Sequence, residues 1–194
     1  MKRFISILSA VLLLSAAVFA DEYEDDEEYD DGYVYDQNGA GDQFLKIDLG
    51  ANFPLNFNGK IYVGAGASVG YYYFLNSSFA LGGDAIIGYN VSIGNKPLIT
   101  VPITVGAMFQ PIAGKFEFPL MLNIGIASTT CQTMTYFPSF SAKFSAGAYY
   151  RYSESWSFGL STNTYWIPQW ISGESEKSDH GFFTTLGLSV RYHF

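Results

Sequence analysis

The feature that most constrains this chain is an alternation of side chains with a period of two, which is clearest in residues 182–194, FFTTLGLSVRYHF. One face of this segment is mostly apolar and holds Phe182, Thr184, Leu186, Leu188, Val190, Tyr192 and Phe194. The residues between them are mostly small or polar. Since successive side chains of a β-strand point to opposite faces, the segment is predicted to be a strand with one apolar and one polar face.

The same alternation returns in seven earlier segments that are separated by turn-like sequences. Their apolar faces span residues 45–53, 61–73, 79–91, 99–109, 116–126, 140–152 and 156–166. No helical pattern lies between them, and most connections are short enough for hairpins. The sequence therefore predicts an all-β fold, an eight-stranded antiparallel up-and-down β-barrel.

The crowding of the apolar faces decides which way they point. Each apolar face carries about six residues, many of them large, whereas the interior of an eight-stranded barrel is just wide enough for side chains to fill. Charged residues make up 14% of the chain, against about 25% in a typical soluble domain. A lipocalin-like barrel with an apolar interior is therefore rejected, and a transmembrane barrel with lipid outside and small or polar residues inside is expected.

Aromatic residues near both ends of the strands agree with this orientation. They include Tyr71, Phe109 and Trp156 toward one end, and Tyr89 and Trp166 toward the other. Two aromatic girdles that flank an aliphatic band are typical of membrane barrels.

Residues 1–20 have the pattern of a secretory signal peptide. Lys2 and Arg3 precede an apolar run of about 16 residues, which is short for a membrane-spanning helix of about 20 residues. Small residues at Val18 and Ala20 predict cleavage after Ala20. No cysteine lies directly after the apolar run, so a lipid anchor is not expected.

Residues 21–42 are predicted to form an acidic disordered leader, placed in the periplasm. Nine acids and no base occur in residues 21–31, and such a block of like charges repels itself. The remainder of the chain, residues 43–194, is nearly neutral and forms the predicted barrel domain. The leader lacks the spacing of a calcium-binding loop, so no metal site is expected there, although a role in binding cations or a partner stays open.

Catalytic chemistry has little support in the sequence. His180 follows Ser178 and Asp179 in the last predicted loop, and His193 is expected to line the lumen. Adjacent loop residues rarely form a working relay, because the base must be held by a third group. No enzyme activity, metal or cofactor is expected, and the neutral body with its acidic leader argues against nucleic-acid binding. Cys131 is the only cysteine, so no disulfide within the chain is possible.

Charged residues on the polar faces are predicted to line the lumen. They are Lys46, Asp48, Asp84, Lys115, Glu117, Lys143, Arg151 and Arg191. Both signs occur, and such groups are expected to pair with one another. Pro102 and Pro119 lie within neighbouring predicted strands, and because proline cannot donate to a ladder, they predict weak pairing and a lateral opening there.

The combination of a signal peptide, eight strands and an alternating last strand resembles the small bacterial outer-membrane β-barrels over residues 43–194. Within that strand, Leu186, Leu188, Val190, Tyr192 and Phe194 resemble the C-terminal signal that barrel assembly machinery reads. The size is similar to that of OmpX, OmpW and the OmpA transmembrane domain. The stretch KPLITVPITVGAMF is most similar to OmpW-type barrels, and the many Tyr and Phe residues resemble small spirochaete barrels.

This resemblance implies a monomeric protein of the bacterial outer membrane whose partners are lipid and the assembly machinery. It implies, as the first hypothesis, an OmpW-like narrow channel for small molecules, apolar ones included. Inward glycines such as Gly64, Gly66 and Gly70 would widen its tube, unless they only permit close packing. The alternative is a structural or surface-display barrel with a blocked lumen that acts through its outer loops.

Overall fold

The computed structural model describes residues 38–57, 60–132, 134–169 and 179–194. The predicted signal peptide and nearly all of the acidic leader lie outside the described residues. Among the described residues, no helix is long and apolar enough to cross a membrane.

Eight long antiparallel strands form the fold, and two strands of two residues each are added between the fourth and fifth of them. The long strands are β1 (Gln43–Pro54), β2 (Gly64–Phe74), β3 (Phe79–Val91), β4 (Pro97–Phe109), β7 (Leu120–Cys131), β8 (Met134–Arg151), β9 (Trp156–Gln169) and β10 (Asp179–His193). The short ones are β5 (Ile112–Ala113) and β6 (Phe116–Glu117).

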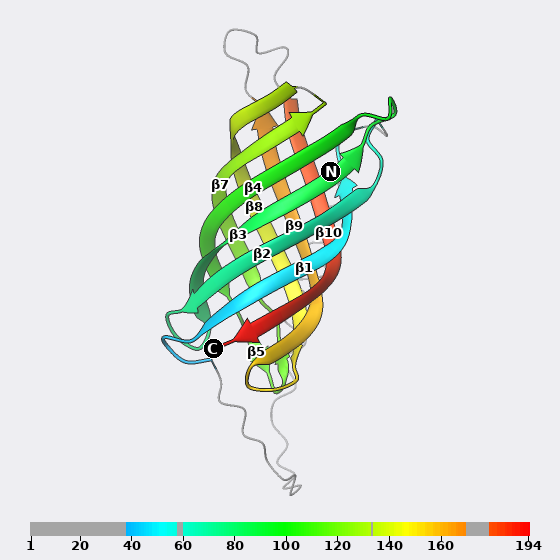
Figure 1. The fold of residues 1–194 in the computed structure, drawn as a ribbon. Helices are drawn as coiled ribbons and strands as arrows, with labels where there is room; N and C mark the ends of the chain where they lie inside the picture. The colour runs from blue at the N-terminus through cyan, green and yellow to red at the C-terminus, as the bar shows by residue number, and fades with distance from the viewer. Residues whose placement is uncertain (1–37, 58–59, 133, 170–178) are drawn as a thin grey trace, which may run out of the picture. The chain divides into compact units, whose positions relative to one another are not determined.

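The long strands close into a barrel (Figure 1). Each pairs with its neighbour in the chain, and β1 pairs with β10 from Phe44 opposite His193 to Pro54 opposite Phe183. Closure gives each of the eight long strands a partner on both sides, whereas an open sheet in a membrane would leave backbone groups unpaired at its edges. The prediction of an eight-stranded up-and-down barrel is confirmed. We call the end that holds Gln43 and His193 the terminal end, and the opposite end the distal end.

The fifth predicted strand is interrupted near the terminal end. It consists of β6 and β7, both paired with β8, with Phe118 and Pro119 between them. Proline has no N–H to donate, and β6 instead folds into a small hairpin with β5. The turn of that hairpin contains Gly114 at a φ of 56°, a conformation that glycine adopts without steric cost.

The distal end differs from the prediction in two places. The second strand was expected to begin at residue 61, but β2 begins at Gly64, and Ile61 forms a bridge with Ser92 instead. The other place is the connection between the predicted apolar faces at 116–126 and 140–152. The ladder between β7 and β8 continues there to Cys131, past a bulge that shifts the register between Ala127 and Thr129.

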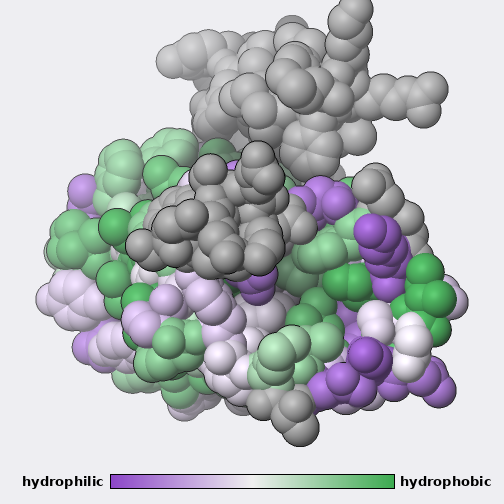
Figure 2. Space-filling model, turned by 90° about the horizontal axis from the view of Figure 1, so that it is seen from above, coloured by the Kyte–Doolittle hydropathy of each residue, from purple (hydrophilic) through white to green (hydrophobic). Residues whose placement is uncertain are grey.

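The orientation of the faces agrees with the prediction. Large apolar side chains lie on the outside, where Leu122 and Leu188 are 67% and 70% exposed. The inward positions are occupied by buried polar groups such as Asn163 and Thr104. Viewed from the distal end, hydrophobic residues recur around the periphery (Figure 2). The apolar side chains thus lie outside, whereas a soluble protein buries them. On a soluble protein, an exposed apolar surface of this size would mark an interaction site.

Candidate functional site

A network of ion pairs crosses the lumen near its middle and is centred on Asp84 of β3. Lys46 Nζ of β1 lies 3.3 Å from Asp84 Oδ1, and Lys143 of β8 pairs with Asp84 Oδ2. The Tyr72 hydroxyl donates to the same carboxylate, as does Asn123 Nδ2 at 3.1 Å. These residues come from five strands, β1, β2, β3, β7 and β8, so the network ties together more than half of the barrel wall.

Asp48 extends this network toward the other side of the barrel. Its Oδ2 lies 3.1 Å from Lys46 Nζ and accepts hydrogen bonds from Ser68 Oγ at 2.6 Å and Asn163 Nδ2 at 3.1 Å. Its Oδ1 accepts from Ser189. With two lysines and two aspartates, the network is neutral. Such pairing with additional hydrogen bonds is what a buried charge requires.

A second charged cluster fills the lumen at the terminal end. Arg151 Nη1 donates to Glu117 Oε1 and to Asn38 Oδ1, each at 2.8 Å. Arg191 Nη1 lies 3.4 Å from Glu117 Oε2 and donates to Gln110 Oε1 at 2.7 Å. The carboxylate of Glu117 therefore forms ion pairs with two guanidinium groups.

Aromatic rings hold the Arg191 guanidinium within the barrel. Its central carbon lies 3.5 Å from the centroid of the Tyr149 ring and 4.7 Å from that of Phe44. Arg191 is fully buried, and contact with the faces of aromatic rings stabilises a desolvated cation.

Ser157 and His193 form a pair next to this cluster that resembles the start of a nucleophile–base relay. His193 Nε2 lies 2.9 Å from Ser157 Oγ, but His193 Nδ1 lies 3.1 Å from Arg151 Nη1. Because a guanidinium can only donate, Nδ1 must accept and the ring proton must be on Nε2. His193 therefore donates to Ser157 and cannot take its proton, so this arrangement is unsuited to activating a nucleophile.

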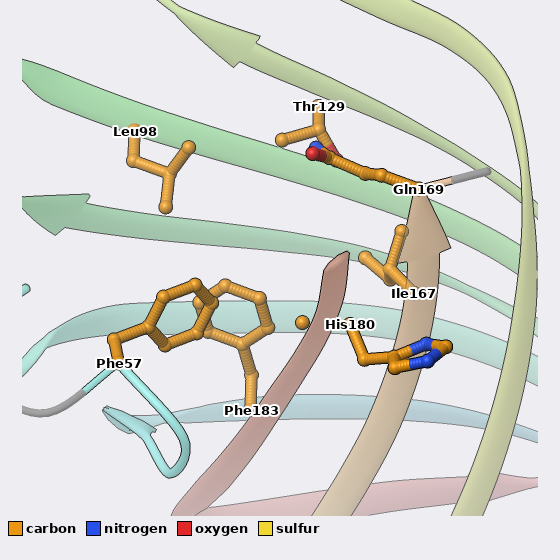
Figure 3. Close-up of a pocket in the computed structure, with 8 residues that line it drawn as sticks. Phe57, Leu98, Thr129, Ile167, Gln169, His180 and Phe183 are labelled. Atoms are coloured by element: carbon orange, nitrogen blue, oxygen red, sulfur yellow. The ribbon is translucent and has the colours of Figure 1, made fainter. Parts of the chain in front are cut away.

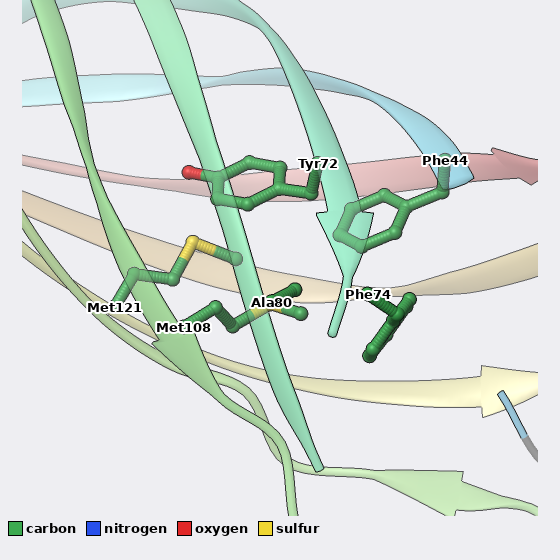
Figure 4. Close-up of a cluster of buried hydrophobic side chains, with 6 residues drawn as sticks. All are labelled: Phe44, Tyr72, Phe74, Ala80, Met108 and Met121. Carbon is green, nitrogen blue, oxygen red and sulfur yellow. The ribbon is translucent and has the colours of Figure 1, made fainter. Parts of the chain in front are cut away.

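An apolar cluster packs beside the charged cluster at the terminal end (Figure 4). It consists of Phe44, Tyr72, Phe74, Ala80, Met108 and Met121. The ring of Tyr72 belongs to this cluster while its hydroxyl reaches Asp84. Apolar packing and the ion-pair network thus share a side chain, and the lumen is filled by side chains at this level.

The distal part of the lumen has a polar layer beneath an apolar one. Asn52 Nδ2 donates to Asn90 Oδ1 at 2.8 Å, and Tyr165 and Thr185 donate to Asn52 Oδ1. Further out, a second apolar cluster contains Ile86, Leu98, Ala127, Tyr165, Ile167 and Phe183.

A small pocket of about 60 Å³ opens beside this apolar cluster (Figure 3). Its lining consists of Phe57, Leu98, Thr129, Ile167, Gln169, His180, Gly181 and Phe183. The rings of Phe57 and Phe183 are in contact, with centroids 5.1 Å apart and a tilt of 41° between their planes. The pocket is mostly apolar and has room for only a short group.

Seven of the eight charged residues predicted to line the lumen are buried inside the barrel, in the two charged clusters. Lys115 is the exception, and its prediction was wrong. It lies in the turn between β5 and β6 with an exposed side chain. Alternation places a side chain only within a strand, and β6 begins one residue later.

The two prolines predicted to mark a lateral opening lie at different levels of the wall. Pro102 is opposite Ala127 in an unbroken ladder between β4 and β7. On its other side, the ladder between β3 and β4 is interrupted between Ala85 and Gly88. Pro119 lies between β6 and β7 at the terminal end. The two prolines are not brought together, and a lateral opening at Pro102 and Pro119 stays a prediction.

The inward glycines allow the strands to approach closely. A Cβ on Gly187 would lie 2.1 Å from the carbonyl oxygen of Leu49, and one on Gly50 would lie 2.2 Å from that of Leu186. At Gly50 and Gly187 the place of a side chain is taken by neighbouring backbone, and at Gly66 and Gly70 it is taken by the side chains of Thr185 and Asp84, as the close-packing alternative expects.

Sequence reasoning missed the neutral members of the site. Tyr72, Tyr149 and Tyr165 are inward and fully or almost fully buried, and Asn38 and Gln110 join the terminal cluster. The parity of the strands does place the tyrosines inward, but many other tyrosines face outward. In the described part of the chain, no group of three or more His, Cys, Asp or Glu could hold a metal ion.

Comparisons with known proteins agree with this architecture. A protein-family model matches residues 23–192. An uncharacterized protein of Treponema pallidum (strain Nichols) is 30% identical over 172 residues, which cover 79% of this chain and 78% of the relative. A second uncharacterized protein of the same organism is 26% identical over 160 residues, which cover 75% of this chain and 55% of that relative.

Two solved structures share the fold. Neisserial surface protein A superposes with a TM-score of 0.67 at 12% identity, over 79% of this chain and 99% of that one. The outer membrane protein OprG from Pseudomonas aeruginosa superposes with a TM-score of 0.50 at 11% identity, over 80% and 97% of the two chains. The resemblance to small outer-membrane barrels and to spirochaete proteins is confirmed, whereas the narrower likeness to OmpW stays a prediction. The chain belongs to the same family as the 30%-identical Treponema pallidum protein, and its fold is that of the small eight-stranded outer-membrane β-barrels.

Proposed function

We propose that this protein is a structural or surface-display barrel of the outer membrane, with a lumen closed to solutes, which acts through its distal loops. The observation that carries the proposal is the chain of ion pairs Asp48–Lys46–Asp84–Lys143, which crosses the lumen from β1 to β8. This is the alternative of the two functions expected from the sequence.

The closed lumen is supported at three levels of the barrel. The middle network, the terminal cluster around Glu117 and the apolar cluster around Phe183 each fill the interior with buried side chains. Opening a path would separate buried ion pairs. Removing one partner of a buried ion pair typically lowers the stability of a protein by about 3–5 kcal/mol. A resting barrel with these contacts intact is expected to conduct no ions.

Membrane insertion follows from the outer surface in this proposal. Export would use residues 1–20, and the outward side chains of β10, among them Leu188 and Tyr192, would be read by the assembly machinery. Outer-membrane lipid would then cover the exposed apolar band. No enzyme activity is proposed, and a monomer suffices because the barrel closes on itself.

Planar-bilayer recording tests the closed lumen. The wild-type protein is expected to show no steady conductance. The double variant Asp84→Ala/Lys143→Ala removes the half of the ion-pair chain that reaches β3 and β8 while keeping the net charge, and brief openings are expected. Lys115→Ala is the control, because its side chain lies outside the lumen. A steady conductance in the wild type would refute the proposal.

A second candidate function rests on the distal pocket. Its mostly apolar lining and volume of about 60 Å³ suit a short apolar group. This candidate keeps one part of the channel hypothesis, namely that the barrel binds small apolar molecules. Binding there does not require passage through the barrel. Uptake of a small apolar solute into vesicles that contain the protein, compared with empty vesicles, separates transport from binding: equal uptake argues against transport.

A further inference from the structure

We propose that Arg191 forms, inside the terminal end of the barrel, a binding site for a small oxyanion of the carboxylate or phosphate class. The proposal goes beyond the closed barrel described above and does not depend on its conductance. It rests on the hydrogen bonding of one guanidinium group, on the charges around it and on the neighbouring amides.

The first argument concerns which nitrogens of Arg191 have a hydrogen-bond partner. Nη1 donates to Gln110 Oε1 and lies near Glu117 Oε2. Nε and Nη2 are buried and have no hydrogen-bond partner among the described residues. These two nitrogens form one edge of the planar guanidinium, and their parallel N–H groups match two oxygens of a carboxylate or phosphate. Buried polar groups are rarely left without a partner, so this edge is suited to a bidentate ligand.

The second argument is the charge of the cluster. Arg151 and Arg191 share the single carboxylate of Glu117. His193 is neutral in this arrangement, because its Nδ1 faces Arg151 and its Nε2 proton is donated to Ser157. The cluster therefore carries one excess positive charge, whereas the middle network is neutral. An uncompensated buried charge is costly, and a bound anion would neutralise it.

The third argument is the polarity of the other unsatisfied atoms. At the terminal end, Asn38 Nδ2 and Gln110 Nε2 are also buried without a partner among the described residues, and both are donors. In the middle of the lumen, by contrast, the unpartnered atoms are hydroxyls and acceptor oxygens, such as those of Ser141 and Asn123. An excess of donors beside an excess of positive charge favours an oxyanion, which can only accept.

The rings of Tyr149 and Phe44 fix the position of the guanidinium. A guanidinium held in this way loses little conformational entropy when it binds a ligand. Arg151 is the more exposed arginine. It donates to the carbonyl oxygens of Ser153 and Glu154 in the turn after β8, and it is joined to Arg191 through Glu117. We infer that an anion enters from this turn.

Titration of the full-length mature protein in detergent micelles tests the site. The protein is labelled with ¹⁵N-arginine, and the Nε–H resonance of Arg191 is followed during addition of inorganic phosphate, acetate or chloride at constant ionic strength. A saturable shift with phosphate or acetate, and none with chloride, is expected. The two oxyanions distinguish a phosphate from a carboxylate preference. A response to chloride equal to that of the oxyanions, or no saturable shift with any of them, would overturn the proposal.

Two variants separate an anion site from a merely structural cluster. Glu117→Gln removes the competing carboxylate and should tighten phosphate binding at least roughly fivefold, because that is the effect of one charge about 4 Å away in water and a buried site screens charges less. Glu154→Gln removes an exposed acid at the same end and should leave the affinity unchanged; an equal effect of both variants would mean general electrostatics and refute the site. Arg191→Lys keeps the charge but lacks the two-nitrogen edge, so binding should be lost. Should Arg191→Lys fail to fold, the wild-type and Glu117→Gln titrations still decide.

Discussion

Lys46 on β1 reaches past the whole of strand β2 to pair with Asp84 on β3, at 3.3 Å between Nζ and Oδ1. Inside a narrow barrel, strands that are not neighbours in the sheet can thus be joined by side chains. Such a contact adds a tie across the lumen to the hydrogen bonds along the wall, and it couples the stability of the barrel to the closure of its interior.

Replacing Asp84 with alanine is expected to destabilise the barrel by about 3–5 kcal/mol, because it leaves Lys143 buried without its carboxylate. Unfolding by urea in detergent micelles, followed by tryptophan fluorescence, measures the change. Glu154→Gln, an exposed acid, should change the free energy of unfolding by less than about 0.5 kcal/mol. The double variant Asp84→Ala/Lys143→Ala should recover part of the loss. If Asp84→Ala matched Glu154→Gln, the network would not stabilise the fold.

Placing arginine at Leu188 tests the orientation of the wall. Leu188 lies at the middle of β10, opposite Leu49 and Leu160 on its two neighbours. A cation facing lipid at this depth should cost about 2–4 kcal/mol. Stability in phospholipid vesicles, measured by urea unfolding, gives the value, with Ile93→Arg in the β3–β4 turn as the control of small effect. A mature protein that stayed monomeric in buffer without detergent would contradict this orientation.

The period of two was sufficient to predict the fold because it recurs in every long strand, each of which has one outward and one inward face. In residues 182–194, the outward positions are mostly apolar, and each inward position had to fit a narrow tube. The prediction was wrong where a residue left its strand. Lys115 has the parity of an inward residue, but Gly114 turns the chain before β6 begins. Alternation also gave no sign of the break between β6 and β7.

The pairing of the lumen charges could be expected, but the specific partners could not. Which inward residues meet depends on the registers of all the ladders, and a shift of one residue would turn a strand's side chains to the other face. Tyr72 illustrates this limit. Alternation places it inward, between Tyr71 and Tyr73 that face outward, but it does not predict that the Tyr72 hydroxyl meets Asp84.

Alanine at Gly187 is expected to weaken the closure of the barrel. Its Cβ would lie 2.1 Å from the carbonyl oxygen of Leu49 on the neighbouring strand, so β1 and β10 would have to separate. Overpacking of this kind costs about 1–3 kcal/mol. The fraction of protein that keeps its compact form on unheated gels reports the effect. Gly94→Ala is the matched control, because a Cβ there meets only the Lys96 side chain at 3.7 Å. Equal behaviour of the two variants would show that the seam has room.

Ser157 is expected not to react with a fluorophosphonate probe, although it lies 2.9 Å from His193 Nε2. A serine becomes nucleophilic when a histidine nitrogen without a proton accepts its hydrogen. Arg151 donates to Nδ1 of His193, so the ring proton is on the nitrogen that faces Ser157. Mass spectrometry of the probe-treated protein gives the answer, and denatured protein is the control for background labelling. Arg151→Gln is the informative variant, since a glutamine oxygen could accept from Nδ1 and reverse the tautomer. Labelling of the wild type at Ser157 would contradict the assigned tautomer and reopen a hydrolytic role for this end of the barrel.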